Sequence, residues 1–303
     1  MAQNIMVIMG GFSAEREVSL QSGRNIAEAL RRKGCSVTTH DLTDSRKLIA
    51  TLNRNKPDVV FNALHGNWGE DGTVPALLDL LQIPYTHSGM GASYIGMNKH
   101  LAKLIARDAG IKTAFWRKMT VREFSTIGST LPRPYVVKPV SDGSSVGVCI
   151  VRETEDIFQI RYDNPDLELL IEKYIPGREL TVMCLEGKAG VVTEMSPKGG
   201  FYDYRHKYTA GETLHILPAD LPDDVTATCL SYAETIHNKL GCNTVSRSDF
   251  RYNPEDGVVF LEINTHPGMT GLSLVPEQAK YLGISYEDLC MKLVENASCR
   301  PLK

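Results

Sequence analysis

Short apolar runs alternate with amphipathic stretches in the first part of the chain. Residues 5–9 are apolar and end in two glycines, and residues 18–32 have the apolar spacing of an amphipathic helix. The same alternation of strand, helix and strand recurs at residues 36–40, 46–53 and 58–61. This pattern predicts a parallel sheet with helices on both faces, which binds ligands beyond the carboxyl ends of its strands. We therefore expect a site in the loops after Met9 and Phe61.

The pattern changes after a passage rich in Pro, Thr, Ser and Gly at residues 83–92, and we place a domain boundary near residue 97. A helix is expected at 99–109. Short strands separated by turns are expected at residues 135–139, 148–151, 169–173, 179–185, 188–194, 244–252 and 258–263. Hairpin turns are predicted at Glu186-Gly187 and at residues 253–257. The later part of the chain therefore has the pattern of antiparallel α+β structure.

The composition narrows the class of protein. Of 303 residues, 42% are hydrophobic and 23% are charged, which excludes membrane, fibrous and disordered classes, and the length suggests about two domains. Lys and Arg number 33 against 36 Asp and Glu, so we expect no nucleic-acid or membrane partner. Any bound anion must be met by local groups.

Cysteine usage and the first residues indicate the compartment. The 7 cysteines include no CxxC pair, which favours reduced thiols over a disulfide framework or a cysteine zinc site. Residues 1–4 have no basic stretch, and the apolar run after them is too short for a signal peptide or a membrane span. We expect a cytoplasmic protein.

A lysine ends the apolar strand at 135–139, and a Gly/Ser loop follows it. Lys138 beside the exposed backbone N–H groups of residues 141–147 suits a polyphosphate, because charge and donors converge on it. A hairpin loop with a solvated lysine is the alternative. Neither a Walker A loop nor the Rossmann glycine fingerprint is present, so a bound nucleotide requires another fold.

Polar side chains alternate on the two strands of the last predicted hairpin. Arg247 and Asp249 share one face of the first strand, and Glu262 and Asn264 share one face of the second. If the two faces coincide, the oxygens suit a Mg²⁺ ion that also bridges phosphates. A solvated face with cross-strand charge pairs is the alternative, although the second strand is otherwise apolar.

Two further segments carry weaker signals. Glu172 and Glu179 flank a strand end where carboxylates could hold ribose hydroxyls, but a plain strand end has the same pattern. The segment 199–211 is aromatic, charged and bounded by glycines, and we interpret it as a lid whose Lys207 reaches a phosphate and whose Tyr208 reaches the substrate. A surface loop without function is the alternative.

The first domain offers Glu15 and His65 on the loops that follow its predicted strands. His65 opens the glycine-rich segment 65–72, and Glu15 stands at a helix start. Helix N-termini favour acidic side chains in any case, so capping is the alternative for Glu15.

Taken together, these segments resemble the D-alanine–D-alanine ligases, members of the ATP-grasp superfamily. The likeness covers nearly the whole chain in eight segments that keep the family order: GGFSAEREVSLQSG, HGNWGEDG, MNK, VVKPVSDGSSVGV, EKYIPGRE, FYDYRHKY, SRSDF and EINTHPGMTGLSLVP. The resemblance implies a parallel, Rossmann-like α/β domain over residues 1–97. It implies a two-part ATP-grasp fold after it, divided into residues 98–180 and 181–303.

The resemblance also implies the ligands of a nucleotide site. ATP would lie between the last two parts, with Lys99 and Lys138 near its phosphates and Lys207 closing over the γ-phosphate. The residues expected at adenine and ribose are Glu172, Lys173, Ile175 and Glu179. Two Mg²⁺ (or Mn²⁺) ions would be held by Asp249, Glu262 and Asn264, with Glu262 bridging them.

The family likewise implies sites for two D-alanine molecules. Glu15 would meet the ammonium group of the first and His65 its carboxylate, and Ser144 and Tyr208 would join Glu15 in closing the lid. The groups expected to stabilise the reacting centre and to hold the second carboxylate are Arg247, Gly268, Ser273 and Leu274. The family further implies a homodimer.

Three functions are compatible with these features. The first is an ATP-dependent ligase that joins two D-alanines through a D-alanyl phosphate for peptidoglycan. The second is an ATP-grasp ligase for another carboxylate, or one that uses D-lactate, although Tyr208 is the residue expected of dipeptide-forming members. The third is an inactive nucleotide-binding regulator, which predicts loss of Arg247 or the metal ligands, and all of them are present.

Overall fold

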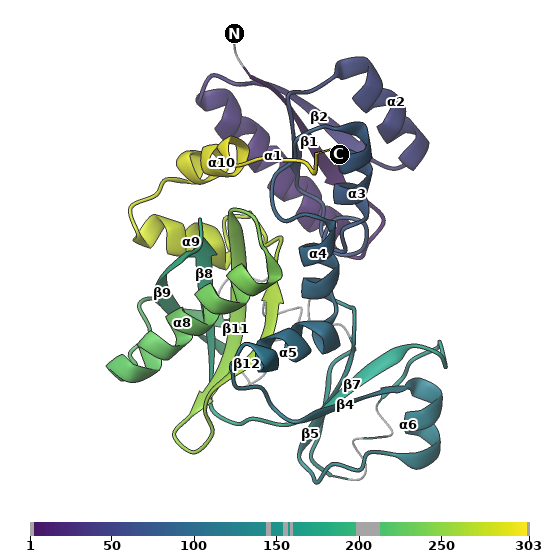
Figure 1. The fold of residues 1–303 in the computed structure, drawn as a ribbon, viewed down its shortest axis with the longest axis vertical. Helices are drawn as coiled ribbons and strands as arrows, with labels where there is room; N and C mark the ends of the chain where they lie inside the picture. The colour runs from purple at the N-terminus through teal and green to yellow at the C-terminus, as the bar shows by residue number, and fades with distance from the viewer. Residues whose placement is uncertain (1–2, 144–146, 154–156, 158–159, 198–212, 302–303) are drawn as a thin grey trace.

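Three β-sheets organise the described part of the chain, and helices connect and cover them (Figure 1). The computed structural model describes the whole chain except residues 1–2, 144–146, 154–156, 158–159, 198–212 and 302–303. No helix in the part described is both long and apolar enough to cross a membrane.

The first sheet is parallel and has the strand order β2-β1-β3, as the pattern predicted. Its elements are β1 (Asn4–Gly10), α1 (Arg16–Arg32), β2 (Ser36–Leu42), α2 (Ser45–Asn55), β3 (Val59–Asn62) and α3 (Thr73–Leu81). Alternate residues of β1 enter two different apolar clusters: Ile5 packs with residues of α1, and Met6 packs with residues of α2 and α3. Helices therefore cover both faces, and the loops after β1 and β3 meet at one edge.

The second sheet is antiparallel, with the order β4-β7-β5-β6. Its strands are β4 (Trp116–Thr120), β5 (Tyr135–Pro139), β6 (Cys149–Val151) and β7 (Glu168–Lys173), and α6 (Val121–Ile127) follows β4. Thr120 and Glu123 form a capping box that begins α6.

The third sheet is also antiparallel, with the order β10-β9-β8-β11-β12. Its strands are β8 (Arg178–Leu185), β9 (Lys188–Pro197), β10 (Thr213–Ile216), β11 (Val245–Asn253) and β12 (Gly257–Asn264). Both predicted hairpins are confirmed. At the first, Glu186 and Gly187 have φ values of 51° and 79°, the paired positive angles that a tight two-residue turn requires.

Four helices from distant parts of the described chain pack on the third sheet. They are α4 (Met90–Met97), α5 (Lys99–Asp108), α8 (Asp223–Leu240) and α9 (Leu274–Tyr281). The helix α10 (Tyr286–Glu295) packs on α9 and α1 beside this sheet. The helix α4 begins inside the passage 83–92, where the sequence predicts an interruption of the strand–helix alternation. Both α4 and α5 pack against β12.

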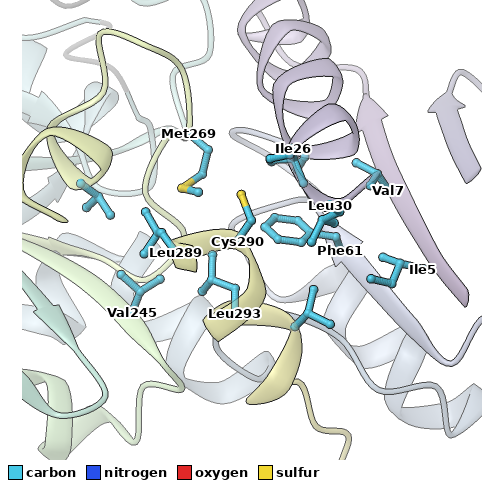
Figure 2. Close-up of a cluster of buried hydrophobic side chains, with 14 of the residues drawn as sticks. Ile5, Val7, Ile26, Leu30, Phe61, Val245, Met269, Leu289, Cys290 and Leu293 are labelled. Carbon is cyan, nitrogen blue, oxygen red and sulfur yellow. The ribbon is translucent and has the colours of Figure 1, made fainter. Parts of the chain in front are cut away.

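The end of the chain returns to its beginning. Figure 2 shows Ile26 and Phe61 of the first sheet and its helices facing Cys290 and Leu293 of α10, and all four side chains are buried. This single apolar cluster also includes Val245 of β11. The first and third sheets are therefore held together by one core, which fixes the loops of one against the strands of the other.

Candidate active site

The hairpin of β11 and β12 brings four polar residues to one face. Arg247 pairs with Asn264 across the two strands, and Asp249 pairs with Glu262. Directly opposite residues of antiparallel strands project from the same side of the sheet. The polar faces of β11 and β12 therefore coincide, which is the condition under which these side chains could hold a metal ion together.

Asp249 is held by three hydrogen bonds in this structure. Arg247 donates from Nε to one carboxylate oxygen and from Nη2 to the other, both at 2.9 Å. The buried hydroxyl of Thr181, which lies opposite on β8, donates to the same carboxylate at 2.6 Å. Thr181 was not identified from the sequence, although its place on the neighbouring strand follows once the strand order is known.

Lys99 links this hairpin to the loop after β5. It begins α5, where Asn98 accepts a hydrogen bond from the backbone N–H of Leu101. Its Nζ donates to the carbonyl oxygen of Asp142 at 2.5 Å and lies 3.6 Å from Glu262 Oε2. A single ammonium group therefore contacts both the loop expected to meet phosphates and the expected metal ligand.

Lys138 and Glu172 form a buried ion pair on neighbouring strands of the second sheet, 2.5 Å from Nζ to Oε1. The Nζ of Lys103 lies 3.0 Å from the second oxygen of Glu172. Burial alone would raise the pKa of Glu172, but the two ammonium groups outweigh it and hold the pKa at about 2. Sequence reasoning did not identify Lys103, although it lies four residues after Lys99, where one helix face carries both.

The nucleoside residues proposed from the resemblance lie where the second sheet passes into the third. Lys173 pairs with Asp256 at 2.9 Å. Arg251 donates to the carbonyl oxygen of Ile175 at 3.1 Å and pairs with Glu179 at 3.1 Å. Arg251 was also not identified from the sequence, but its register opposite Glu179 explains the contact.

The first sheet contributes a buried histidine. His65 Nδ1 lies 3.1 Å from Glu70 Oε1, and its Nε2 lies 3.3 Å from the hydroxyl of Ser22. Burial raises the pKa of Glu70, and the hydrogen bond from His65 opposes that rise. Both ring nitrogens therefore have polar neighbours that orient the imidazole toward the site.

Glu15 stands at the N-cap position of α1, but its side chain makes no capping hydrogen bond there. A Cβ atom added to Gly66 would lie 3.2 Å from Glu15 Oε2, and one added to Gly143 would lie 3.5 Å from it. The carboxylate thus stands between the loop after β3 and the loop after β5, and the capping interpretation is wrong for its side chain.

The turn into α9 closes the site on the opposite side. Ser273 accepts a hydrogen bond from the backbone N–H of Thr270 at 2.9 Å and is the N-cap residue of α9. A Cβ atom on Gly268 would lie 2.9 Å from Ser273 Oγ and 4.0 Å from His65 Cε1, so a larger residue here would displace the Ser273 hydroxyl.

Some of these groups line one cavity of about 110 Å³, whereas Lys138, Glu172, Lys173, Ile175, Glu179 and Asp249 are not among its lining residues. Of the residues expected from the sequence, those that line it are Glu15, His65, Lys99, Arg247, Glu262, Asn264, Gly268, Ser273 and Leu274. Glu70 and Asp142 line it as well and were not assigned roles from the sequence. Ser144, Lys207 and Tyr208 lie outside the described residues.

Two family models match the chain. The one described as D-ala D-ala ligase C-terminus covers residues 105–295, and the one described as D-ala D-ala ligase N-terminus covers residues 46–88. The D-alanine–D-alanine ligase of Erythrobacter litoralis is 48% identical over 97% of this chain and 93% of its own. That of Acidiphilium cryptum is 48% identical over 98% and 99%.

Solved structures agree with these matches. The D-alanine–D-alanine ligase of Bacillus anthracis complexed with ATP is 32% identical and superposes with a TM-score of 0.81 over 98% of this chain and 97% of that one. The VanG D-Ala:D-Ser ligase of Enterococcus faecalis is 27% identical, with a TM-score of 0.79 over 97% and 99%. The architecture is the ATP-grasp fold preceded by a parallel α/β domain. The chain belongs to the D-alanine–D-alanine ligase family.

Proposed function

We propose that this protein joins two D-alanine molecules at the expense of ATP, releasing ADP and phosphate, in the synthesis of peptidoglycan precursors. The observation that carries the proposal is the shared cavity. Its wall joins the groups proposed to bind an amino acid, such as Glu15 and His65, to those suited to phosphate and metal, such as Lys99 and Glu262.

The reaction requires an activated carboxylate. One carboxylate oxygen of the first D-alanine attacks the γ-phosphorus of ATP, ADP leaves, and D-alanyl phosphate forms. The amine of the second D-alanine then attacks the carbonyl carbon, loses a proton, and inorganic phosphate leaves with the C–O bond pair. Positioning and charge neutralisation supply most of the catalysis of such transfers.

Residues from α5 and the second sheet would bind ATP. Lys99 and Lys138 would bind its phosphates. In support of this, Lys99 donates a hydrogen bond to Asp142, in the loop that is expected to bind phosphates. The groups proposed for adenine and ribose are Glu172, Lys173, Ile175 and Glu179, which lie together where β7 leads into β8. Lys207 is proposed for the γ-phosphate and lies outside the described residues.

The donor set at the hairpin fits Mg²⁺ or Mn²⁺. Asp249, Glu262 and Asn264 offer two carboxylates and an amide oxygen on one face, and phosphate oxygens complete such a site. We propose that they hold two ions, with Glu262 between them. The ions would neutralise charge on the transferring phosphoryl group.

The substrate groups surround the same cavity. Glu15 would bind the ammonium group of the first D-alanine, and His65 its carboxylate. The backbone N–H of Gly268 and the guanidinium of Arg247 would stabilise charge at the reacting carbon. Ser273 and the backbone N–H of Leu274 would hold the carboxylate of the second D-alanine. Ser144 and Tyr208, which lie outside the described residues, would close the lid over Glu15.

We also propose a division into residues 1–97, 98–180 and 181–303. The second sheet ends at Lys173 and the third begins at Arg178, so the change of sheet falls shortly before the proposed boundary, which lies within β8. Helix α5 packs against β12 and so links the last two parts. We further propose a homodimer that works in the cytoplasm without a nucleic-acid or membrane partner.

Incubation of the protein with ATP, Mg²⁺ and D-alanine tests this function. We expect phosphate release that depends on D-alanine and a product with the mass of the dipeptide. Parallel reactions with D-serine or D-lactate as the second substrate should give little mixed product near neutral pH. Phosphate release with another carboxylate and none with D-alanine would overturn the proposal.

A further inference from the structure

Lys103 is a lysine with no exposed surface. Its side chain has 0% exposure, and its ammonium group lies 3.0 Å from Glu172, donates to the carbonyl oxygen of Phe260 at 3.2 Å, and stands 5.9 Å from the ring centre of Trp116. Burial of an ammonium group is costly unless such partners compensate it. Lys103 is therefore anchored on three sides.

The cluster around Glu172 has more positive than negative charge. Lys138 and Lys103 each contact one oxygen of the same carboxylate, at 2.5 Å and 3.0 Å, and all three side chains are buried. A single buried lysine–glutamate pair is hard to separate, because a lone buried charge is left behind. With two lysines, one can leave while the other still neutralises Glu172.

Of the two lysines, Lys138 is the one that can leave. It is the last residue but one of β5, shortly before the loop that runs through Asp142, whereas Lys103 is fixed in α5 by Phe260 and Trp116 as well as by Glu172. Lys99, one turn earlier on α5, already contacts the same loop. The presence of Lys103 beside Glu172 thus leaves Lys138 able to bind another anion.

We propose that Lys103 is a positioning residue for ATP: it keeps Glu172 neutralised so that Lys138 can exchange the carboxylate for the phosphates. This inference rests on the proposed function, because it takes Lys138 to be a phosphate-binding group. It assigns Lys103 no contact with the nucleotide. An effect on the phosphates should therefore weaken ADP binding more than adenosine binding, whereas an effect through Glu172 on the adenine should change both alike.

The test compares dissociation constants of ADP and adenosine, both with Mg²⁺, for the wild-type chain and Lys103→Met. We expect ADP to bind at least tenfold more weakly to Lys103→Met while adenosine changes less than twofold. The KM for ATP should rise and the KM for D-alanine should stay within twofold. Lys118→Met removes a lysine that pairs with Glu168 at the exposed edge of the same sheet, and it should change neither ligand's affinity.

A second variant separates positioning from packing. In Lys103→Met/Glu172→Gln the neutral amide no longer holds Lys138. At least half of the rise in the ratio of ADP to adenosine dissociation constants, on a logarithmic scale, should therefore be reversed. A packing role predicts no recovery, and equal losses for ADP and adenosine would likewise overturn the inference. Should Lys103→Met fail to fold, the single variant Glu172→Gln tests the inference. We expect its ratio of adenosine to ADP dissociation constants to equal or exceed that of the wild-type chain. A lower ratio would overturn the inference.

The wild-type measurements distinguish the two proposals. Absence of ADP binding or of dipeptide formation in the wild-type chain would refute the proposed function. If the wild-type chain binds ADP and forms the dipeptide, and Lys103→Met binds ADP with the same affinity, this inference alone is refuted.

Discussion

The guanidinium of Arg247 holds both carboxylate oxygens of Asp249, two residues further along the same strand, at 2.9 Å each. Such a bidentate pair is among the stronger polar contacts that proteins form. We propose Asp249 as a metal ligand and Arg247 as a stabiliser of transferred charge. In both roles the two side chains must give up this contact and bind the metal ion and the phosphoryl group instead. The contact therefore pre-orients two groups whose functions begin when they separate.

Arg247→Lys keeps the positive charge and removes the planar donor pair. We expect kcat to fall by about 100-fold or more, in the range found when one group that stabilises a transition state is removed. The KM for ATP should change much less, because the proposed role belongs to the reacting centre. Steady-state phosphate release over a range of ATP concentrations measures both values, and an unchanged kcat would contradict the role.

Glu262→Gln tests the metal assignment with little change of shape. Loss of the carboxylate charge should lower kcat at least about 100-fold at low Mg²⁺, because a neutral amide is a weaker ligand for this hard cation. The measurement is phosphate release across a Mg²⁺ titration. Glu255→Gln, at the exposed turn of the same hairpin, is the matched control and should remain within about twofold of wild type. Full activity of Glu262→Gln would refute the assignment.

His65→Gln should affect the first D-alanine and not ATP. The imidazole lies between Ser22 and Glu70 at the cavity wall, so its loss removes the proposed partner of the substrate carboxylate. We expect the KM for D-alanine to rise about tenfold, which corresponds to about 1.4 kcal/mol, with the KM for ATP nearly unchanged. His215→Gln, which disrupts another histidine–glutamate pair, serves as the control. Equal increases in both KM values would argue against a substrate contact.

Two stacked histidines should make the fold sensitive to acid. The rings of His87 and His266 lie 3.9 Å apart and are buried, and burial lowers the pKa of His87 to about 3. Between that value and the unfolded pKa of about 6.5, the unfolded chain binds more protons. Stability is therefore complete above the unfolded pKa and falls as the pH drops toward 3, by up to about 1.4 kcal/mol per pH unit for each such histidine.

Urea unfolding between pH 4 and pH 7 measures this slope. His87→Asn removes one titrating group and suits the backbone, because His87 has a φ of 69° and asparagine tolerates such positive angles. The variant should show a smaller decrease in the free energy of unfolding at low pH. A slope equal to that of wild type would show that His87 does not contribute.

Leu293→Ala tests the core that joins the two ends of the chain. Leu293 is fully buried in the cluster between α10 and α1, so the truncation should cost about 2–5 kcal/mol of unfolding free energy. Leu80→Ala removes the same atoms from a side chain that is 76% exposed and should cost less than about 0.5 kcal/mol. Similar losses in both variants would show that the α1–α10 cluster does not hold the ends together.

Much of the local structure follows from the sequence because its causes are local. The alternation of polar residues and the turn at residues 253–257 predict the β11–β12 hairpin, and a hairpin fixes its own register. Continued without interruption, that register would set Asp249 opposite Leu261. A register shift between Asp249 and Phe250 brings Asp249 opposite Glu262 instead. Helix α8 was not predicted, and the start of α4 lies within a passage rich in turn residues, where tertiary contacts override the local pattern.

The tertiary structure decides which distant charges meet. Nothing local to Lys103 indicates that it reaches Glu172, because that contact depends on how α5 packs between two sheets. Similarly, Glu15 and Glu262 line one cavity because α10 packs against α1 in a shared apolar core. The sequence determines the residue types, the strands and the turns through short-range sterics and periodicity. Only the packing of residues far apart in the chain determines the distances between charges on which the proposed chemistry depends.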